Sequence, residues 1–324
     1  MSVTDIDGAK RGSDVRRVLT FARNYATVIL VVVLCVVMSF ASPVFLSSTN
    51  LINIVNQNVP LSLIAIAGTF VIISGAFDLS TASIFAVASV IAAWLAVKTG
   101  NPALGLMSAP LVGLVLGVAN GLAVTLLRVH SFLATLATSL VYGAIAVLVT
   151  GGSLIVVSAS SFTTLGRGRW FGIFIAIYVF VFFLALMWFL LNGTTFGRHV
   201  FAVGGNPEAA QLSGIRVART RIIVFALSGV ASGSAAAIGV SLVGSGQPQA
   251  GTGLALSAIA AVILGGTSIY GGRGAVWRSV TGVLLIALIG NGFDLLNFNP
   301  QIQNLVEGVI ILAAVGLSAV GKRR

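Results

Sequence analysis

Residues 192–221 read NGTTFGRHVFAVGGNPEAAQLSGIRVARTR, a polar and basic stretch between two apolar runs of membrane-spanning length. The stretch holds four arginines: Arg198, Arg216, Arg219 and Arg221. Basic residues beside membrane spans concentrate on the cytoplasmic side, so we expect this stretch to face the cytoplasm. It therefore predicts a fold in which apolar helices cross a bilayer on either side of a cytoplasmic loop.

Within this loop, the segment NPEAAQLSG carries the signals that begin and end a short helix. Asn206 suits the N-cap, Pro207 suits the first helical position, and Glu208 lies in the first turn, where the helix dipole favours an acid. Gly214 suits the left-handed residue after the C-terminus. Only about two turns fit between these caps, and so short a helix is marginal alone in water. It needs a surface to lie on, so we expect a soluble partner to dock here.

The composition is that of a membrane protein. The chain of 324 residues is 57% hydrophobic and 8% charged, with a mean hydropathy of +1.08, which is far outside the range of soluble domains. The net charge of +11 does not indicate nucleic acid, because the basic residues lie at span ends rather than on one soluble face. We therefore expect the lipid bilayer around this chain and no nucleic-acid partner.

About ten apolar segments reach, or nearly reach, the length that a helix needs to cross a bilayer. The expected spans are 26–46, 59–74, 81–97, 103–127, 131–150, 171–191, 222–243, 254–265, 275–295 and 302–320, with a polar loop at 47–58. Threading them from a cytoplasmic N-terminus leaves only Lys98, Arg167 and Arg169 of the 18 basic residues outside. This bias predicts an all-α polytopic protein with about ten spans and both termini in the cytoplasm. The expected domains are a basic cytoplasmic tail at 1–24, a transmembrane domain at 25–320 with its cytoplasmic loop at 192–221, and a basic tail at 321–324.

A weak internal repeat recurs at one fixed offset. Ser74-Gly75 matches Ser245-Gly246, and Asn120-Gly121 matches Asn291-Gly292, with apolar residues before each. In a ten-span fold the matched segments run in opposite directions, as an inverted repeat requires. Two dipeptide matches in a chain with 38 glycines can also arise by chance, so the repeat stays open.

The sequence contains no recognisable enzyme constellation. A phosphate-binding P-loop needs a lysine after a Gly-rich turn, and Lys10, Lys98 and Lys322 all lack that context. His130 and His199 have no cysteine or carboxylate neighbours at the spacing of metal ligands. We therefore expect no catalytic residue, no metal site and no cofactor bound by this chain.

Asp78, in ISGAFDLSTAS, is the strongest candidate for a functional residue within the apolar part of the chain. An acid between two apolar spans is costly if it faces lipid, so it should face protein, water or a pathway. One role is structural, with Asp78 or Ser80 capping the helix that begins near Thr81. The other role is to line a cavity or close a gate, and Gly75 allows the tight turn that either role needs. The conduit or gate candidates are thus Gly75, Asp78 and Ser80.

Four ordered stretches resemble the membrane permease subunit of bacterial ABC importers for ribose, xylose and related monosaccharides. They are GAFDLSTASIFAVAS, NGLAVTLLRVHSFLATLATSLVYGAIAVLVTGG, TTFGRHVFAVGGNPEAAQLSGI and LSAIAAVILGGTSIYGGRG. The similarity runs from about residue 50 to residue 318. Two pairs depart from the usual pattern: Ala76-Phe77 replaces Gly-Ile, and His130-Ser131 replaces Val-Pro or Met-Pro. Neither departure disturbs the family resemblance.

The resemblance implies a homodimer of permeases in the bacterial cytoplasmic (inner) membrane. It also implies two ATPase subunits on the cytoplasmic face, which use ATP and Mg²⁺, and a periplasmic sugar-binding protein outside. The short helix at 206–214 is then a coupling helix in a groove of the ATPase, and ATP binding moves it to switch the pathway between its two faces. The coupling residues are Asn206, Pro207, Glu208, Ala209, Gln211, Gly214 and Arg216.

Two alternatives for the function remain at this point. Permeases for polyols, nucleosides or branched-chain amino acids share much of the same pattern. A stand-alone secondary transporter suits ten spans and an inverted repeat, but such carriers place more ionisable residues within their spans. The residues do not indicate which sugar passes, nor whether the two permease copies are identical.

Overall fold

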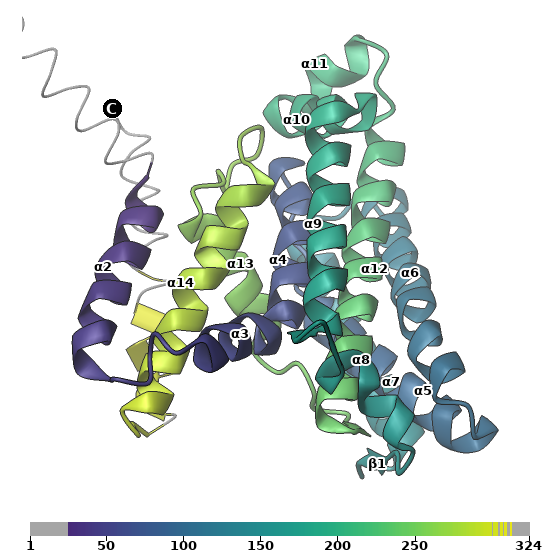
Figure 1. Ribbon diagram of the computed structural model, residues 1–324. Helices are drawn as coiled ribbons and strands as arrows, with labels where there is room; N and C mark the ends of the chain where they lie inside the picture. Colours follow the sequence, from purple (N-terminus) through teal and green to yellow (C-terminus); the bar gives the residue numbers. More distant parts are fainter. Residues whose placement is uncertain (1–24, 300, 304, 307, 310–311, 313–324) are drawn as a thin grey trace, which may run out of the picture.

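The computed structural model describes residues 25–299, 301–303, 305–306, 308–309 and 312, which fold mainly as apolar helices (Figure 1). Six helices in this part are long and apolar enough to cross a membrane: α5 (Thr81–Thr99), α6 (Pro102–Leu126), α7 (Ser131–Thr150), α9 (Ile175–Gly193), α12 (Val217–Val243) and α14 (Val276–Leu295). A seventh span arises if α3 (Ser48–Gln57) and α4 (Val59–Ile73), bent by 51°, count as one. The expected fold class, an all-α polytopic membrane protein, is confirmed.

The count of ten spans stays a prediction. Each expected span up to residue 295 coincides with a helix. Two of these helices, α2 (Ala26–Ala41) and α13 (Leu254–Leu264), are shorter than the six helices that could cross a membrane. The segment 302–320 lies mostly outside the described residues, and the tails 1–24 and 321–324 lie wholly outside them.

The expected polar loop at 47–58 is wrong, because this segment forms α3. Ser47 caps the helix by accepting a hydrogen bond from the Asn50 N–H at 3.2 Å. The Asn50 and Asn291 side chains exchange two hydrogen bonds, at 3.0 and 2.9 Å, and thereby join α3 to α14. Ile54 is buried on the same helix. The polar residues therefore pair with another helix, which the segment's composition does not reveal.

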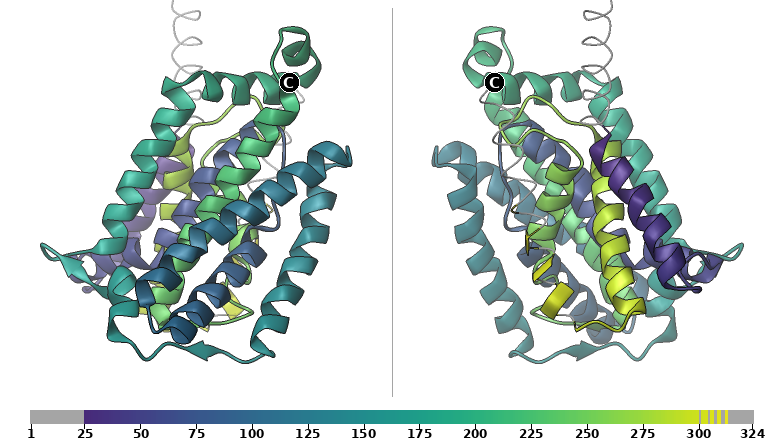
Figure 2. Two further views of the ribbon diagram at one scale, coloured as in Figure 1. Left: turned by 90° about the vertical axis from the view of Figure 1, so that its right-hand side faces the viewer. Right: turned by 90° about the vertical axis from the view of Figure 1, so that its left-hand side faces the viewer.

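Helix α12 lies at the centre of the bundle, packed against α4, α5 and α6 (Figure 2). Glycines line its contact with α6: a Cβ at Gly113 would overlap the carbonyl oxygen of Gly229, and a Cβ at Gly117 would overlap that of Phe225. Small residues at four-residue spacing let two helix backbones approach closely where water is absent. The small residues of α6 and α12 thus allow these two helices to pack closely.

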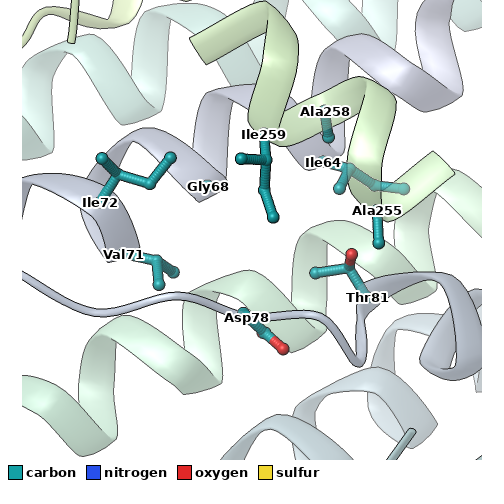
Figure 3. A pocket seen from close by; sticks show the side chains of 9 residues that line it. All are labelled: Ile64, Gly68, Val71, Ile72, Asp78, Thr81, Ala255, Ala258 and Ile259. Carbon is teal, nitrogen blue, oxygen red and sulfur yellow. The ribbon is translucent and has the colours of Figure 1, made fainter. Parts of the chain in front are cut away.

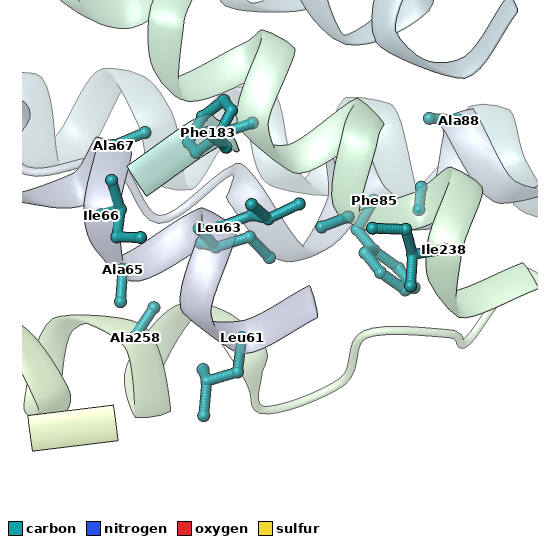
Figure 4. Packing of buried hydrophobic residues seen from close by; sticks show 14 of the residues in the cluster. Leu61, Leu63, Ala65, Ile66, Ala67, Phe85, Ala88, Phe183, Ile238 and Ala258 are labelled. Carbon is teal, nitrogen blue, oxygen red and sulfur yellow. The ribbon is translucent and has the colours of Figure 1, made fainter. Parts of the chain in front are cut away.

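The apolar core connects the helices around α12. Figure 4 shows side chains from five helices in it, including Leu63 of α4, Phe85 of α5, Phe183 of α9, Ile238 of α12 and Ala258 of α13. Many other apolar side chains on the helices are exposed, as expected of a protein whose outer surface faces lipid.

The two ends of the bundle differ in structure. At one end lie α10 (Thr195–Gly205) and α11 (Pro207–Leu212) (Figure 1). Short elements occupy the opposite end: β1 (Ile155–Val156), η1 (Ser160–Thr163), α8 (Thr164–Arg167), β2 (Arg169–Trp170), β3 (Ile173–Phe174) and β4 (Ser245–Gly246). β1 pairs with β4 and β2 with β3, both antiparallel. Ser245-Gly246 therefore forms a strand, whereas Ser74-Gly75 follows a helix, and the internal repeat stays a prediction.

Candidate functional site

The loop 192–221 folds as α10, α11 and the start of α12, and the capped helix predicted within it is confirmed. The Asn206 side chain accepts a hydrogen bond from the Ala209 N–H at 3.0 Å, and Pro207 begins α11. Gly214 adopts a left-handed φ of +83° and donates its N–H to the Gln211 carbonyl at 3.0 Å. The local signals thus determine both ends of α11.

Helix α11 is exposed apart from Ala210. Leu212, its last residue, is 91% exposed. All the predicted coupling residues lie on this exposed surface: Asn206, Pro207, Glu208, Ala209, Gln211, Gly214 and Arg216. The structure therefore presents them together at one end of the bundle.

The C-terminal end of helix α10 contacts two loops, and glycines form the contact. A Cβ at Gly204 would overlap the carbonyl oxygen of Ile73, at the end of α4. A Cβ at Gly271 would lie 2.6 Å from the Gly204 carbonyl oxygen and 3.0 Å from the Gly75 Cα. Gly272 donates its N–H to the same Ile73 carbonyl at 2.8 Å. Backbone thus contacts backbone here, and we call this contact the glycine junction: Gly75, Gly204, Gly271 and Gly272.

Gly75 has a left-handed φ of +76°, which glycine adopts without strain. The loop then leads to Asp78, which is 5% exposed. Asp78 Oδ1 accepts hydrogen bonds from the Ser80 N–H at 3.0 Å and from Ser80 Oγ at 2.6 Å. Asp78 Oδ2 accepts one from Ser228 Oγ of α12 at 2.7 Å. The buried acid therefore faces protein, as its cost in lipid requires.

The hydrogen bonds continue from Ser80 to two further helices. Asn120 of α6 donates from Nδ2 to Ser80 Oγ at 2.6 Å, and the Tyr142 hydroxyl of α7 donates to Asn120 Oδ1 at 3.0 Å. We call this set the polar network: Asp78, Ser80, Asn120, Tyr142 and Ser228. Sequence reasoning missed Tyr142 and Ser228 and noticed Asn120 only as part of a repeat. A polar side chain within an apolar helix is a sequence signal for such a network. The signal does not show which polar side chains bond to one another.

The capping role predicted for Ser80 is wrong, and the role of Asp78 is partly structural. The Ser80 side chain makes no capping bond to α5. Asp78 instead accepts the N–H of Ser80, the residue that precedes the helix. Such a turn satisfies a backbone donor that would otherwise be buried without a partner.

Helix α7 also holds this loop. Ser131 Oγ accepts the Phe77 N–H at 3.0 Å, and Thr135 Oγ1 accepts the Leu79 N–H at 3.1 Å. Phe77 and Ser131 belong to the two pairs that depart from the usual family pattern, and they are bonded to each other. A proline at 131 has no hydroxyl for this bond, so the two departures form one local feature.

A small pocket of about 10 Å³, which is roughly the space that one water molecule needs, lies beside the polar network (Figure 3). Its lining residues come from α4, α5, α13 and the loop before α5: Ile64, Gly68, Val71, Ile72, Asp78, Thr81, Ala255, Ala258 and Ile259. Within the described part of the chain, no group of three or more His, Cys, Asp or Glu side chains could hold a metal ion.

The apolar helix bundle and its buried polar network define the class of a polytopic membrane protein. Residues 50–315 match the family described as branched-chain amino acid transport system / permease component, and the chain belongs to this family. No solved structure matches the chain.

Curated relatives make the resemblance more specific. The chain is 39% identical to the ribose import permease protein RbsC of Bacillus subtilis, over 87% of this chain and 88% of that protein. It is 35% identical to RbsC of Escherichia coli K12, over 89% and 91% of the two chains. It is 38% identical to the L-arabinose transport system permease protein AraH of the same strain, over 78% and 77%. The resemblance to sugar-type ABC importer permeases is thus confirmed, and the chain is a transport subunit.

Proposed function

We propose that this chain forms the membrane conduit of an ATP-driven importer for a monosaccharide of the ribose type. The observation that carries the proposal is the similarity to ribose and L-arabinose permeases over most of both chains. The sugar preference of the relatives favours this substrate over the polyol, nucleoside and amino-acid alternatives. A pathway for a neutral sugar also suits a bundle in which the buried acid Asp78 accepts hydrogen bonds from Ser80 and Ser228.

In this proposal, α11 is the coupling helix that docks into the ATPase. Leu212 is 91% exposed on a surface that faces away from the bundle. An exposed large apolar side chain on a short helix is typical of an anchor for a partner's groove. Glu208 and Arg216 place opposite charges at the two ends of the same surface, which can fix the orientation of docking.

The glycine junction provides a route from the ATPase to the conduit. Its Gly204 belongs to α10, which precedes α11, and its Gly75 lies three residues before Asp78. Because glycine backbones are in direct contact there, a shift of α10 displaces the loop that carries Asp78. Closely packed interfaces of this kind switch between arrangements rather than deform gradually.

The remaining partners follow from the importer class. A periplasmic binding protein delivers the sugar, a second copy of the chain completes a homodimer, and the ATPase uses ATP and Mg²⁺. The chain itself binds no cofactor, lies in the bacterial cytoplasmic (inner) membrane with both termini in the cytoplasm, and does not bind nucleic acid.

The first test is a pull-down of the tagged chain from its native membrane, with mass spectrometry of the proteins that accompany it. The purified complex is then reconstituted in vesicles and assayed for uptake of labelled ribose and L-arabinose. We expect an ATPase, a binding protein and ATP-dependent uptake of at least one sugar. A chain that purifies alone and transports without ATP would identify a secondary carrier. ATP-dependent uptake of branched-chain amino acids and of neither sugar would contradict the proposed substrate.

A further inference from the structure

The hairpin of β2 and β3 carries exposed aromatic residues at its tip. Trp170 is 61% exposed and Phe171 is 85% exposed, and their ring centroids lie 5.3 Å apart. Figure 2 shows this teal hairpin projecting sideways from the bundle at the start of α9. Adjoining exposed apolar groups mark a contact with a protein or a membrane, so the hairpin is a candidate for such a contact.

The turn of this hairpin holds Phe171 in a conformation that bulky residues rarely adopt. Only Phe171 and Gly172 separate the two strands, and their φ angles are +48° and +82°. A two-residue turn with positive φ at both positions favours asparagine, aspartate or glycine, and a bulky side chain there is strained. The exposed Phe171 ring gains little burial within the chain in return. Retention of a strained residue without internal packing indicates a role outside the chain.

Tyr178 joins the hairpin to the exposed face of α9. Its hydroxyl donates to the Trp170 carbonyl at 2.9 Å, and its ring centroid lies 5.7 Å from that of Trp170. Val181 and Phe182 follow three and four residues later, so they lie on the same face of the helix, and both are exposed. Because α9 is long and apolar enough to cross a membrane, we expect this face to contact lipid. The hairpin tip is therefore continuous with a lipid-facing surface.

The charges of the hairpin suit the phosphate groups of lipids. Residues 151–193 contain two arginines and no acidic residue. Arg167 donates hydrogen bonds to two carbonyls at the end of α12. Arg169 is exposed, and its guanidinium lies 4.4 Å from the centroid of the Phe174 ring. A guanidinium matches the geometry of phosphate, and tryptophan and tyrosine are enriched where membrane meets water. The combination is typical of a segment that lies in the membrane interface.

We propose that the β2–β3 hairpin is a membrane anchor, in which Trp170 and Phe171 insert into the phospholipid bilayer at the level of the headgroups and Arg169 binds a lipid phosphate. Burial of the Phe171 ring in lipid then offsets the strain of its turn. The anchor holds the start of α9 at the bilayer surface. The side of the membrane rests on the proposed function: α11 faces the cytoplasm there, so the hairpin lies in the outer leaflet. Insertion itself requires neither sugar nor ATPase.

The test measures the contact of Trp170 with lipid in the full-length chain, reconstituted in phosphatidylcholine vesicles. Three variants carry one tryptophan each, with phenylalanine at the other tryptophan positions: Trp170 in the first, Trp188 of α9 in the second and Leu212→Trp of α11 in the third. Trp188 is exposed on a spanning helix and Leu212 at the end of the bundle, so they serve as controls for lipid and for water. Fluorescence is quenched by phosphatidylcholine brominated near the headgroup or near the chain end, and separately by iodide on both sides of the membrane.

We expect brominated lipid to quench Trp170, and to do so more when the bromine lies near the headgroup than near the chain end. Iodide should quench Trp170 less than the tryptophan of Leu212→Trp. Phe171→Asn suits the turn, so it should keep the melting temperature of the parent chain. Because it removes the inserted ring, it should lower the quenching of Trp170 by brominated lipid.

Three results would overturn the inference. Quenching of Trp170 by iodide but not by lipid would assign the hairpin to a soluble partner. Shielding of Trp170 from both quenchers would assign it to a contact with a second copy of the chain. Unchanged quenching by lipid in Phe171→Asn would remove Phe171 from the anchor. An importer that takes up neither ribose nor L-arabinose would contradict the proposed function, whereas quenching of Trp170 by lipid would still establish the insertion.

Discussion

At the scale of single residues, Asp78 determines how the loop before α5 is held. One carboxylate satisfies a backbone N–H and two hydroxyls, on Ser80 and on Ser228 of α12. In an apolar bundle these donors have few other partners, so removing the acceptor costs more than removing one donor. The same residue also lines the small pocket between α4, α5 and α13.

We expect Asp78→Ala to lower the melting temperature of the purified permease more than Ser228→Ala does. The first change leaves several buried donors unpaired at about 1–3 kcal/mol each, and the second removes one bond. Thermal unfolding in detergent measures both. Uptake should fall in Asp78→Ala at temperatures where the ATPase still co-purifies. Assembly that fails in proportion to uptake would assign Asp78 a purely structural role.

Gly204 and Gly205 form a matched pair of adjacent glycines at the end of α10. A Cβ at Gly204 would overlap the Ile73 carbonyl, whereas a Cβ at Gly205 would have nothing within 4 Å. We expect Gly204→Ala to abolish ATP-driven uptake because it forces the glycine junction apart. Gly205→Ala should leave uptake near the wild-type rate, since alanine favours a helix more than glycine by about 0.5–1 kcal/mol.

The measurement is ATP-driven uptake in vesicles, together with the ATPase activity of the same complexes. If Gly204→Ala uncouples the two ends of the junction, ATP hydrolysis continues while uptake is lost. Wild-type uptake in Gly204→Ala would remove the glycine junction from the mechanism.

At the scale of elements, the ends of α11 are determined by its own sequence, and the proposed function adds a partner that covers its exposed surface. Six residues with caps at both ends form a helix too short to persist alone in water. Its exposed surface, with Leu212 outermost, therefore favours a bound state in which a groove covers it.

We expect Glu208→Arg, Leu212→Asp or deletion of residues 206–214 to abolish ATPase binding without preventing membrane insertion. Reversing a charge or placing one on the apolar anchor opposes burial against a partner. Co-purification of the ATPase measures the effect. Ser213→Ala is the matched control, because the Ser213 hydroxyl bonds only to the Ala209 carbonyl within this segment. Wild-type levels of ATPase with the first three variants would refute docking through α11.

The contact between α6 and α12 depends on glycine in another way. A Cβ at Gly117 would overlap the Phe225 carbonyl, whereas the nearest atom to a Cβ at Gly143 of α7 would be 4.0 Å away. We expect Gly117→Ala to destabilise the permease by about 1–3 kcal/mol through overpacking, and Gly143→Ala to be neutral. Melting temperatures of the two purified variants compare them directly, and similar values would show that α6 and α12 can separate at little cost.

At the scale of the whole molecule, the proposed function gives each chain one coupling surface, α11. Two copies that share two ATPases would use both surfaces symmetrically, since closed twofold assemblies are the most common arrangement of identical chains.

We expect the purified importer core to contain two identical permeases and two ATPases. Native mass spectrometry of the complex gives its mass and hence its composition. Differential tagging of two permease copies, followed by capture through one tag, checks that both copies occur in one complex. A core with a single permease, or with a second and different one, would contradict the homodimer.

Local signals determined much of this protein. Apolar runs about 20 residues long with few charges favour helices in a bilayer, because a helix satisfies its backbone groups within its own segment. Residues 206–214 carry their own capping chemistry, so α11 could be predicted from neighbours in the chain. The family resemblance likewise needed only ordered motifs, and the chain's relatives bear it out.

Only the tertiary structure could decide which distant residues meet. Asp78 bonds to Ser228 across 150 positions, and the segment 47–58 is helical partly because Asn50 pairs with Asn291 across 241. The glycine junction brings Gly75 and Gly271 of two loops together with Gly204 at the end of α10. A sequence records which side chains can donate, accept or leave room for a neighbour. Their partners depend on how helices pack, and a single sequence does not contain that geometry in any local pattern.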